Sequence, residues 1–367
     1  ENMNAEVEWD EESSAVTIKL DEREIKFIIG SKSYTLNGET HELDVPAQIL
    51  NNRTVIPLRA LAEALGKKVF WDDRGIISVS DNETFDSSKD SELIEYLISR
   101  LSAPSNTGKA LKVLAIGNSF SQDATQWLYE IALDAGIDEI ILGNLYIGGC
   151  TLATHWENAK ENNAAYTYYK NSVGIWEKYN KSTMLQGILD EDWDIITLQQ
   201  ASGVSGMEET YNSDLTNLIE YVNTHKTNPN AKLVWHMTWA YQSDSTHKEF
   251  VNYENDQLKM YNSILSCVQN KILTNPAFSY IIPTGTAIQN LRTSIIGDRL
   301  TRDGYHLSYN LGRYTAALTW FHAITGESID NITFNPEPEE IPEIYIPLIK
   351  KAVKAAIEKP FEITYLN

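Results

Sequence analysis

The residue types of a nucleophilic triad occur in two short segments of the sequence. Ser119 lies in Gly-Asn-Ser-Phe (117–120), directly after an apolar run that begins at residue 111 and directly before a stretch with helical spacing. Asp303 and His306 lie three residues apart in Asp-Gly-Tyr-His (303–306). A serine becomes a nucleophile when a histidine takes its proton and a carboxylate orients that histidine. The short spacing lets one turn project the carboxylate and the imidazole the same way, so the pattern predicts acyl transfer through Ser119.

Each of these residues also has a structural interpretation. Ser119 could cap a helix, Asp303 could cap a helix or a turn, and His306 could be a packed polar residue. Competing metal chemistry has little support, because the seven histidines lack metal-ligand spacing. Cys150 and Cys267 are too few for a thiolate cluster or a disulfide framework. We therefore expect neither a metal site nor a cofactor.

The charge of the chain excludes several partners. The 51 Asp and Glu against 30 Lys and Arg give a net charge of −21, which argues against nucleic acid and anionic membranes. No apolar run reaches about 18 residues, so we expect no membrane insertion. The first residues lack the basic start and apolar centre of a signal peptide. The protein is therefore expected to be cytoplasmic, or its leader is not part of this sequence.

The segments that must position Ser119 alternate between apolar strands and helices. Five apolar runs predict strands: 111–116, 139–147, 194–198, 232–239 and 278–283. Helical stretches such as 213–225 and 253–272 lie between them. Such alternation is typical of a parallel sheet covered on both faces. We expect a three-layer α/β/α domain with a five-stranded parallel sheet. Ligands of such sheets bind beyond the carboxyl ends of the strands, where Ser119 lies.

Residues 1–80 have a different pattern, β-rich with one short helix. Asn37-Gly38 predicts a hairpin turn, and residues 57–66 predict the helix, with proline near its start and glycine at its end. The segment 5–18 recurs at 67–80 with a shared Val-x-Trp-Asp, which indicates an internal repeat. We divide the chain into a β-rich module (1–80), a helical linker (81–109) and an α/β domain with a C-terminal helical extension (110–367).

The first module resembles the copper amine oxidase N-terminal-type domain found on many surface proteins of Gram-positive bacteria. The resemblance covers roughly residues 5–80 and rests on three motifs: NRT (52–54), PLR (57–59) and AEALG (62–66). Despite the name, this stretch contains no copper-ligand cluster. The resemblance implies a spacer or wall-associated module, and hence an extracellular or cell-surface protein whose leader is absent from this sequence.

Residues 111–326 resemble the SGNH (GDSL-type) hydrolases. Block one is GNSF with Ser119, block two is NLYIGGCTL with Gly149, and block five is DGYH with Asp303 and His306. The segments GGCTLATHWENA, WDIITLQQASG and LTRDGYHLS further resemble a poorly characterised bacterial branch of that family. The resemblance implies a serine hydrolase without a cofactor. In it Ser119 attacks, His306 acts as base and then as acid, and Asp303 orients His306.

The same resemblance implies an oxyanion hole built from the N–H groups of Ser119 and Gly149 and a third donor. SGNH enzymes usually take that donor from the asparagine of Gly-x-Asn-Asp after the third strand, but this chain reads TLQQASG. Gln199 or Gln200 could supply an equivalent amide. Successive strand residues point to opposite faces, so only one can reach the site. We favour Gln199, with Gln200 as the alternative.

Three aromatic residues are candidates for binding substrate: Trp156, Trp239 and Tyr241. They could form an apolar wall for a sugar ring, although aromatics near strand ends also serve as core. The sequence as a whole predicts a serine esterase or deacylase that removes O-acetyl or similar small acyl groups from extracellular glycans. The alternatives are a lipase or thioesterase for longer acyl chains, and a glycan- or wall-binding surface protein without activity.

Overall fold

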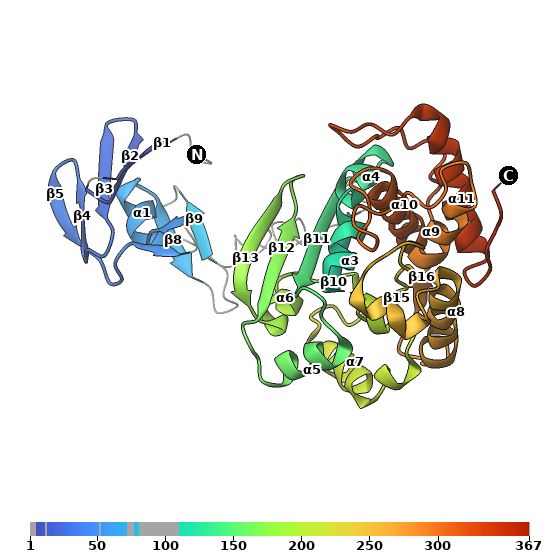
Figure 1. The fold of residues 1–367 in the computed structure, drawn as a ribbon. Coiled ribbons are helices and arrows are strands. Elements are labelled where there is room, and N and C mark those ends of the chain that lie inside the picture. Colours follow the sequence, from blue (N-terminus) through green and yellow to red (C-terminus); the bar gives the residue numbers. More distant parts are fainter. Residues whose placement is uncertain (1–4, 12, 51–52, 72–76, 81–109, 367) are drawn as a thin grey trace. The chain divides into compact units, whose positions relative to one another are not determined.

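The chain forms two compact units, Glu1–Ala103 and Pro104–Asn367. The computed structural model describes residues 5–11, 13–50, 53–71, 77–80 and 110–366 (Figure 1). The predicted helical linker (81–109) lies outside the described residues. The two units are described separately below.

A five-stranded antiparallel sheet dominates the first unit. Its strands are hydrogen-bonded in chain order: β1 (Glu6–Asp10), β2 (Ala15–Leu20), β3 (Arg23–Ile28), β4 (Ser33–Leu36) and β5 (Glu39–Glu42). The predicted Asn37-Gly38 turn joins β4 to β5. Asn37 and Gly38 both have positive φ angles, 49° and 85°, which is the geometry that asparagine and glycine tolerate best in a hairpin turn.

A short helix and two small hairpins complete the first unit. Helix α1 (Leu58–Ala64) follows Pro57, as predicted, and precedes Gly66. The hairpins are β6 (Gln48–Leu50) with β7 (Arg53–Val55), and β8 (Lys68–Trp71) with β9 (Ile77–Ser80). Ala64 and Leu65 at the end of α1 join Ile25 and Phe27 of β3 in one apolar cluster. The helix is therefore part of the core of this unit.

The second unit contains a seven-stranded sheet in the order β13-β12-β11-β10-β14-β15-β16. All five predicted strands are present and parallel: β10 (Ala110–Gly117), β11 (Glu139–Tyr146), β14 (Ile195–Leu198), β15 (Lys232–His236) and β16 (Tyr280–Ile282). The prediction missed two antiparallel strands beyond β11, namely β12 (Tyr166–Asn171) and β13 (Trp176–Ser182). Their sequences are polar and tyrosine-rich, without the apolar run that marks a buried parallel strand.

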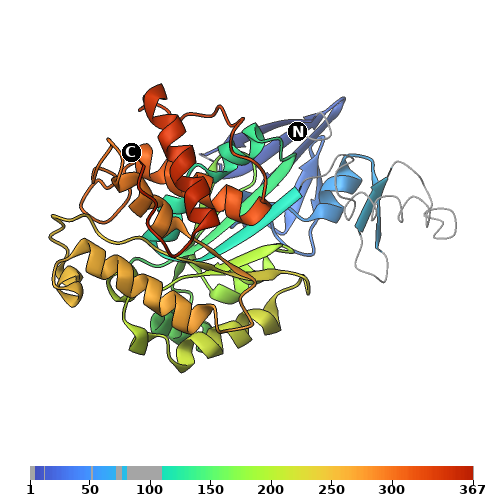
Figure 2. The ribbon, with the colours of Figure 1, turned by 90° about the vertical axis from the view of Figure 1, so that its right-hand side faces the viewer.

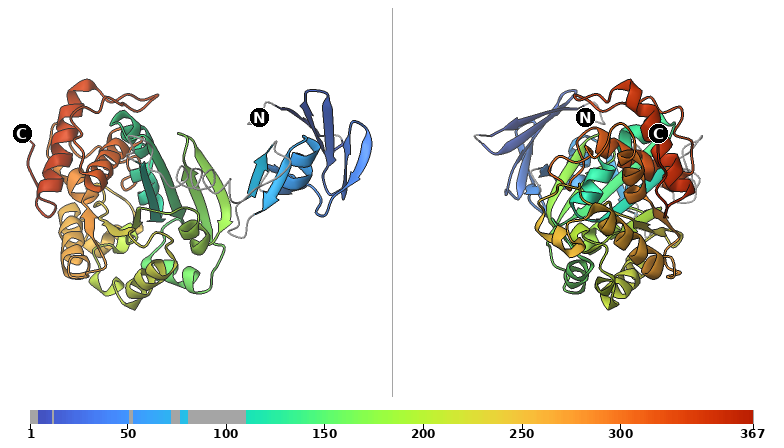
Figure 3. Two further views of the ribbon diagram at one scale, coloured as in Figure 1. Left: turned by 180° about the vertical axis from the view of Figure 1, so that it is seen from behind. Right: turned by 45° about the vertical axis from the view of Figure 1, so that its right-hand side comes forward.

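Helices cover both faces of this sheet and confirm the predicted three-layer α/β/α arrangement. Figure 2 shows α7 (Ser213–His225) and α8 (Gln257–Cys267) on one face and α9 (Thr284–Arg292), α10 (Leu311–Thr325) and α11 (Ile346–Glu358) on the other. From behind, α10 and α11 pack side by side (Figure 3). The remaining helices are α3 (Ser119–Thr125), α4 (Leu128–Asp134), α5 (Leu152–Lys160) and α6 (Met184–Leu189).

One continuous apolar core fills the space between the sheet and its helices. The central strand β10 contributes side chains to both faces, and Val113, Leu114, Ala115 and Ile116 are all buried. A strand buried on both sides has this continuous apolar sequence. Among the described residues, no helix combines the length and the apolar character that a membrane span requires.

Candidate active site

Ser119 lies where β10 turns directly into α3. Gly117 ends the strand, and a side chain there would collide with its surroundings, since a Cβ would lie 2.6 Å from Ser121 Oγ. Asn118 then caps the helix, its Oδ1 accepting the Phe120 N–H at 2.9 Å. Glycine and asparagine at these positions therefore allow the sharp turn that brings Ser119 to the carboxyl end of the central strand.

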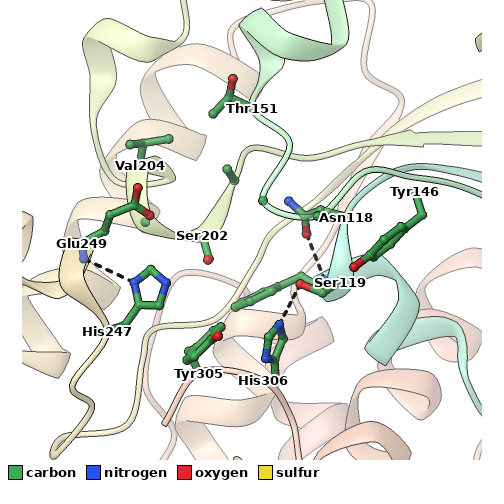
Figure 4. A pocket seen from close by; sticks show the side chains of 15 residues that line it. Asn118, Ser119, Tyr146, Thr151, Ser202, Val204, His247, Glu249, Tyr305 and His306 are labelled. Atoms are coloured by element: carbon green, nitrogen blue, oxygen red, sulfur yellow. Dashed lines mark hydrogen bonds between the residues drawn. The ribbon is translucent and has the colours of Figure 1, made fainter. Parts of the chain in front are cut away.

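The structure brings Ser119, His306 and Asp303 together, and Figure 4 shows the contact between Ser119 and His306. His306 Nε2 lies 2.8 Å from Ser119 Oγ, and His306 Nδ1 lies 2.6 Å from Asp303 Oδ2. The carboxylate therefore orients the Nδ1–H tautomer and leaves Nε2 free to accept the serine proton. This is the nucleophile, base and orienting-carboxylate geometry that acyl transfer needs.

Asp303 is held as a carboxylate by its own turn. Its other oxygen, Oδ1, accepts the backbone N–H groups of Tyr305 at 3.2 Å and of His306 at 2.8 Å. Partial burial would raise the Asp303 pKa. The hydrogen bonds from the His306 side chain and from both N–H groups outweigh this effect and keep the pKa below its ordinary value. The orienting group therefore carries its negative charge at neutral pH.

A buried carboxylate, Asp123, anchors the His306 turn to the helix of Ser119. Asp123 Oδ2 accepts the backbone N–H of Leu307 at 2.8 Å, the residue next to His306. Both oxygens also accept from Arg302, and Oδ1 accepts from Arg313 Nε at 2.8 Å. Asp123 lies one helical turn after Ser119, so this cluster joins the two segments that carry the triad.

Trp239 holds the same turn from the other side. Its indole Nε1–H donates to the carbonyl of Tyr305 at 2.8 Å, and its ring stacks on Phe120 with 4.1 Å between centroids. Gly304 has a φ of 91° and lies against Ser245, where a Cβ would come within 2.9 Å of Oγ. The sequence Asp-Gly-Tyr-His thus needs its glycine for both conformation and space.

A cavity of about 260 Å³ opens beside Ser119. Gly149, with a φ of 63°, lines it together with Ser119. The N–H groups of Ser119 and Gly149 donate no hydrogen bond to any described residue. Two free N–H groups beside the nucleophile form the start of an oxyanion hole.

The structure does not bring either predicted glutamine amide to this cavity. The Gln199 side chain fills the space beneath Gly117, where a Cβ would lie 2.9 Å from Gln199 Oε1. Its amide nitrogen donates to Asn118 Oδ1 at 2.9 Å. Gln200 instead accepts the N–H of Leu152 at 3.0 Å and donates to the Thr210 carbonyl. The prediction of a glutamine as third oxyanion donor is therefore corrected: both side chains are buried in structural hydrogen bonds.

Gln199 belongs to a buried chain that orients Asn118. Its oxygen lies 2.9 Å from His236 Nδ1. Because the Gln199 amide nitrogen already donates to Asn118, its oxygen must accept, so His236 carries its proton on Nδ1. Complete burial lowers the His236 pKa to about 3, which keeps the ring neutral. The chain His236–Gln199–Asn118 thus supports the turn before Ser119.

None of the three predicted aromatic residues lines the cavity. Trp239 and Tyr241 are fully buried, and Trp156 packs half-buried against the core. The prediction that they form a wall for a sugar ring is corrected, because none of them is among the residues that line the cavity. Trp239 instead supports the His306 turn, and Tyr241 bonds to a residue that does line the cavity, Ser202.

Sequence reasoning missed most of the polar residues that face Ser119. The cavity is lined by Ser202, His247, Glu249 and Tyr305 in addition to the predicted residues. Ser202 lies within the quoted TLQQASG segment, and Tyr305 lies within DGYH. His247 and Glu249 lie in a loop without a recognisable motif, so no sequence signal could have identified them.

Two other chemistries have little support at this site. Burial raises the pKa of the Cys150 thiol to about 12, so this neighbour of Gly149 is a poor nucleophile. Among the described residues, no group of three or more His, Cys, Asp or Glu side chains could hold a metal ion. The serine remains the nucleophile that the geometry supports.

Two family models match separate parts of the chain. Residues 112–353 match the family described as "Domain of unknown function (DUF4886)", and residues 1–77 match the copper amine oxidase N-terminal domain. A crystal structure of a DUF4886 family protein from Bacteroides uniformis is 42% identical, with a TM-score of 0.67. It covers 70% of this chain and 98% of that protein. No curated protein sequence matches the chain.

Solved structures of two esterases are more distantly similar. The acetyl xylan esterase AlAXEase is 16% identical with a TM-score of 0.38, over 58% of this chain and all of that one. A carbohydrate esterase family 3 protein from Talaromyces cellulolyticus is 13% identical with a TM-score of 0.37, over 59% of this chain and 97% of that one. Similarity at this level carries no information about the activity of this chain.

Proposed function

The chain belongs to the DUF4886 family of domains of unknown function, and from the geometry of its triad we propose that it is a serine esterase for small acyl groups. The observation that carries the proposal is the hydrogen-bonded series Ser119 Oγ, His306 Nε2, His306 Nδ1 and Asp303 Oδ2, with distances of 2.8 and 2.6 Å. A serine that only capped a helix would not need an oriented base.

In the proposed reaction Ser119 Oγ attacks the ester carbonyl while His306 Nε2 takes its proton. The tetrahedral intermediate collapses when His306 returns that proton to the leaving alcohol, which gives an acyl-enzyme. Water then attacks the acyl-enzyme, again through His306, and releases the acid. Throughout, the Asp303 carboxylate stabilises the imidazolium without taking the proton.

The negative charge of the tetrahedral intermediate falls on the former carbonyl oxygen. The free N–H groups of Ser119 and Gly149, two residues that line the cavity, are the donors we propose for it. Removing one such donor typically costs about 10²–10³ in kcat. Two donors therefore supply a substantial part of the rate acceleration.

The size of the cavity favours a small acyl group. Its volume of about 260 Å³ lies below the roughly 300–1,000 Å³ of pockets for drug-sized ligands. A long acyl chain needs an extended apolar groove, whereas this cavity mixes apolar and aromatic side chains with serine, threonine, histidine and glutamate. Acetyl esters fit better than the substrates of a lipase or a thioesterase.

Glycans outside the cell are the substrates we propose. Residues 1–77 match the copper amine oxidase N-terminal domain, and we propose that this module lies at the cell surface. A wall-associated module would keep the esterase close to acylated carbohydrate. The acidic chain carries a net charge of −21, which disfavours anionic polymers and lipid surfaces as partners.

Hydrolysis of 4-nitrophenyl acetate by the full chain tests the proposal. Wild-type protein should release 4-nitrophenol well above the buffer rate, and Ser119→Ala should lose about 10⁴-fold or more in kcat while keeping its thermal stability. Ser213→Ala, at an exposed serine at the start of α7, controls for substitution of a serine. A folded wild-type protein without turnover would favour the alternative of a non-catalytic surface protein.

A further inference from the structure

One wall of the cavity is not used by the proposed acyl transfer. Ser202 begins the short helix η1 (Ser202–Val204), and His247 and Glu249 lie at the start of η3 (Lys248–Tyr253). All three line the cavity, and Figure 4 shows them across it from Ser119. We call these three side chains the polar wall. Its hydrogen-bonding groups define what it can bind.

His247 presents an N–H donor to the cavity. Its Nδ1 accepts the backbone N–H of Glu249 at 3.3 Å, so a neutral ring carries its proton on Nε2. Desolvation lowers the His247 pKa, and the opposing negative charges of Glu249 and Asp303 do not cancel this effect, which favours the neutral ring at pH 7. Figure 4 shows Nδ1 directed at Glu249 and the other edge of the ring toward the cavity.

Ser202 presents an O–H donor. Its Oγ lies 2.9 Å from the hydroxyl of Tyr241, and Tyr241 is fully buried. Among the described residues, Ser202 Oγ is the hydrogen-bond partner of the Tyr241 hydroxyl. A buried hydroxyl whose proton finds no acceptor costs free energy. The Tyr241 proton therefore goes to Ser202 Oγ. The Ser202 proton is then left for a group in the cavity.

Glu249 presents a charged acceptor. Its carboxylate makes no hydrogen bond and no ion pair with any described residue, although the side chain is half-buried. Gly203 makes room for it, because a Cβ at Gly203 would lie 1.9 Å from Glu249 Oε2. A glycine thus allows a carboxylate to reach the cavity wall with its hydrogen-bonding capacity unused.

These groups complement free hydroxyls on a ring. A sugar hydroxyl can donate to the Glu249 carboxylate and accept from Ser202 or His247 at the same time. The Tyr305 ring, 4.5 Å from the His247 ring, adds an aromatic surface beside them. Within the described part of the chain, no lysine or arginine lines the cavity, so a uronate or phosphate would face Glu249 without compensation. An ammonium group would meet the outward-facing hydrogens of Ser202 and His247.

We propose that the polar wall binds the alcohol side of the ester as a neutral sugar ring with free hydroxyl groups next to the acylated one. This inference rests on the proposed esterase function and names its substrate class. It predicts selectivity for partly acylated glycosides over esters of alcohols that have the same shape but no hydroxyl groups.

Two acetate esters separate this proposal from general esterase activity: a methyl pyranoside carrying one O-acetyl group, and cyclohexyl acetate, a ring of similar size without hydroxyls. The wild-type ratio of kcat/KM for the glycoside to that for cyclohexyl acetate should exceed about tenfold. Glu249→Ala and His247→Phe should each lower this ratio about tenfold, the usual size of a lost hydrogen bond to a charged group or a lost pair of neutral ones.

Thr246→Ala is the matched control, since Thr246 directly precedes His247, is exposed and does not line the cavity. It should keep the wild-type ratio. A wild-type protein that hydrolyses both esters at equal kcat/KM overturns the proposal. So do Glu249→Ala and His247→Phe proteins that fold and keep the wild-type ratio. Faster hydrolysis of an acetylated amino sugar with a free ammonium group than of the neutral glycoside would mean that Glu249 recognises cations. That result would also overturn the proposal.

A binding measurement distinguishes failure of the wall from failure of the esterase. Ser119→Ala retains the polar wall, so saturation-transfer NMR should show contact between this variant and the ring protons of the mono-acetylated glycoside. Adding Glu249→Ala should remove most of that signal. If the wild type hydrolyses neither ester but Ser119→Ala binds the glycoside through Glu249, the proposed esterase function is wrong and the proposed binding by the polar wall stands. Binding that is unchanged by Glu249→Ala refutes the wall.

Discussion

Replacement of Asp123 tests whether the buried carboxylate positions the triad. Asp123 is only 1% exposed and accepts from Arg302, Arg313 and the backbone of Leu307. Asp123→Ala leaves two guanidinium groups without their anion, and removing one partner of a buried ion pair typically costs about 3–5 kcal/mol. A domain of this size loses about 2–4 °C in Tm per kcal/mol. We therefore expect a decrease of roughly 6–20 °C.

The same change should lower kcat more than it raises KM. Leu307 is the residue after His306, and its lost hydrogen bond releases the turn that holds the imidazole against Ser119. A displacement of about 1 Å in a catalytic group can cost about 10²-fold in rate. Differential scanning calorimetry gives the stability of the variant, and 4-nitrophenyl acetate kinetics below its Tm give kcat and KM.

Two further variants separate positioning from a general loss of stability. Asp123→Asn keeps the shape and one acceptor, so both its Tm and its kcat should lie between those of the wild type and of Asp123→Ala. Asp192→Asn removes an exposed carboxylate and should change neither, since exposed charges contribute little. If Asp123→Ala lowered the Tm by less than 2 °C, or kept the wild-type kcat, the assignment of Asp123 would be wrong.

Three other changes test separate parts of the structure. Gln199→Ala removes the support of Asn118 and the acceptor of the buried His236 proton, so it should cost about 1–3 kcal/mol by chemical denaturation; an unchanged stability with a large loss of kcat would return Gln199 to the oxyanion hole. Gly203→Ala should displace the Glu249 carboxylate and reproduce the loss of glycoside preference of Glu249→Ala, whereas a wild-type ratio would contradict that contact. Burial lowers the pKa of His155 to about 3, below its value in the unfolded chain, so the unfolded state binds one extra proton there below about pH 6.5. His155 should therefore contribute a decrease of roughly 3 kcal/mol in the free energy of unfolding between about pH 7.5 and pH 4.5, in addition to a similar contribution from the buried His236. His155→Asn should remove its own share of that decrease, and an equal pH slope in both proteins would contradict the assignment.

Periodicity and turn chemistry in the sequence predicted most of the second unit. The five parallel strands were identified because strands buried on both faces must be apolar along their whole length. Strands β12 and β13 were missed because neither is an apolar run: β12 mixes buried and half-buried polar or tyrosine positions, and β13 is mostly exposed or half-buried. Alternation in "YTYYKN" (166–171) does not separate a strand from a polar loop without the partner strand.

The triad residues were identifiable in the sequence because each stands in a local frame that the chain sets by itself. Ser119 follows a strand and begins a helix, and Asp303 and His306 share one short turn whose glycine has a positive φ. Such frames depend on neighbours within a few residues. Residue type and spacing therefore predicted which groups meet, and the observed distances agree with that expectation.

The polar residues around the triad were decided by the tertiary structure. Gln199 has the right chemistry for an oxyanion donor and an adjacent position in the chain, yet the absence of a side chain at Gly117 lets its amide turn inward to Asn118. His247 and Glu249 reach the cavity because their loop packs beside a glycine from another strand end. Which way an amide or a carboxylate points depends on space and hydrogen-bond partners from distant segments. The residues next to a side chain in the sequence determine neither the space around it nor its distant hydrogen-bond partners.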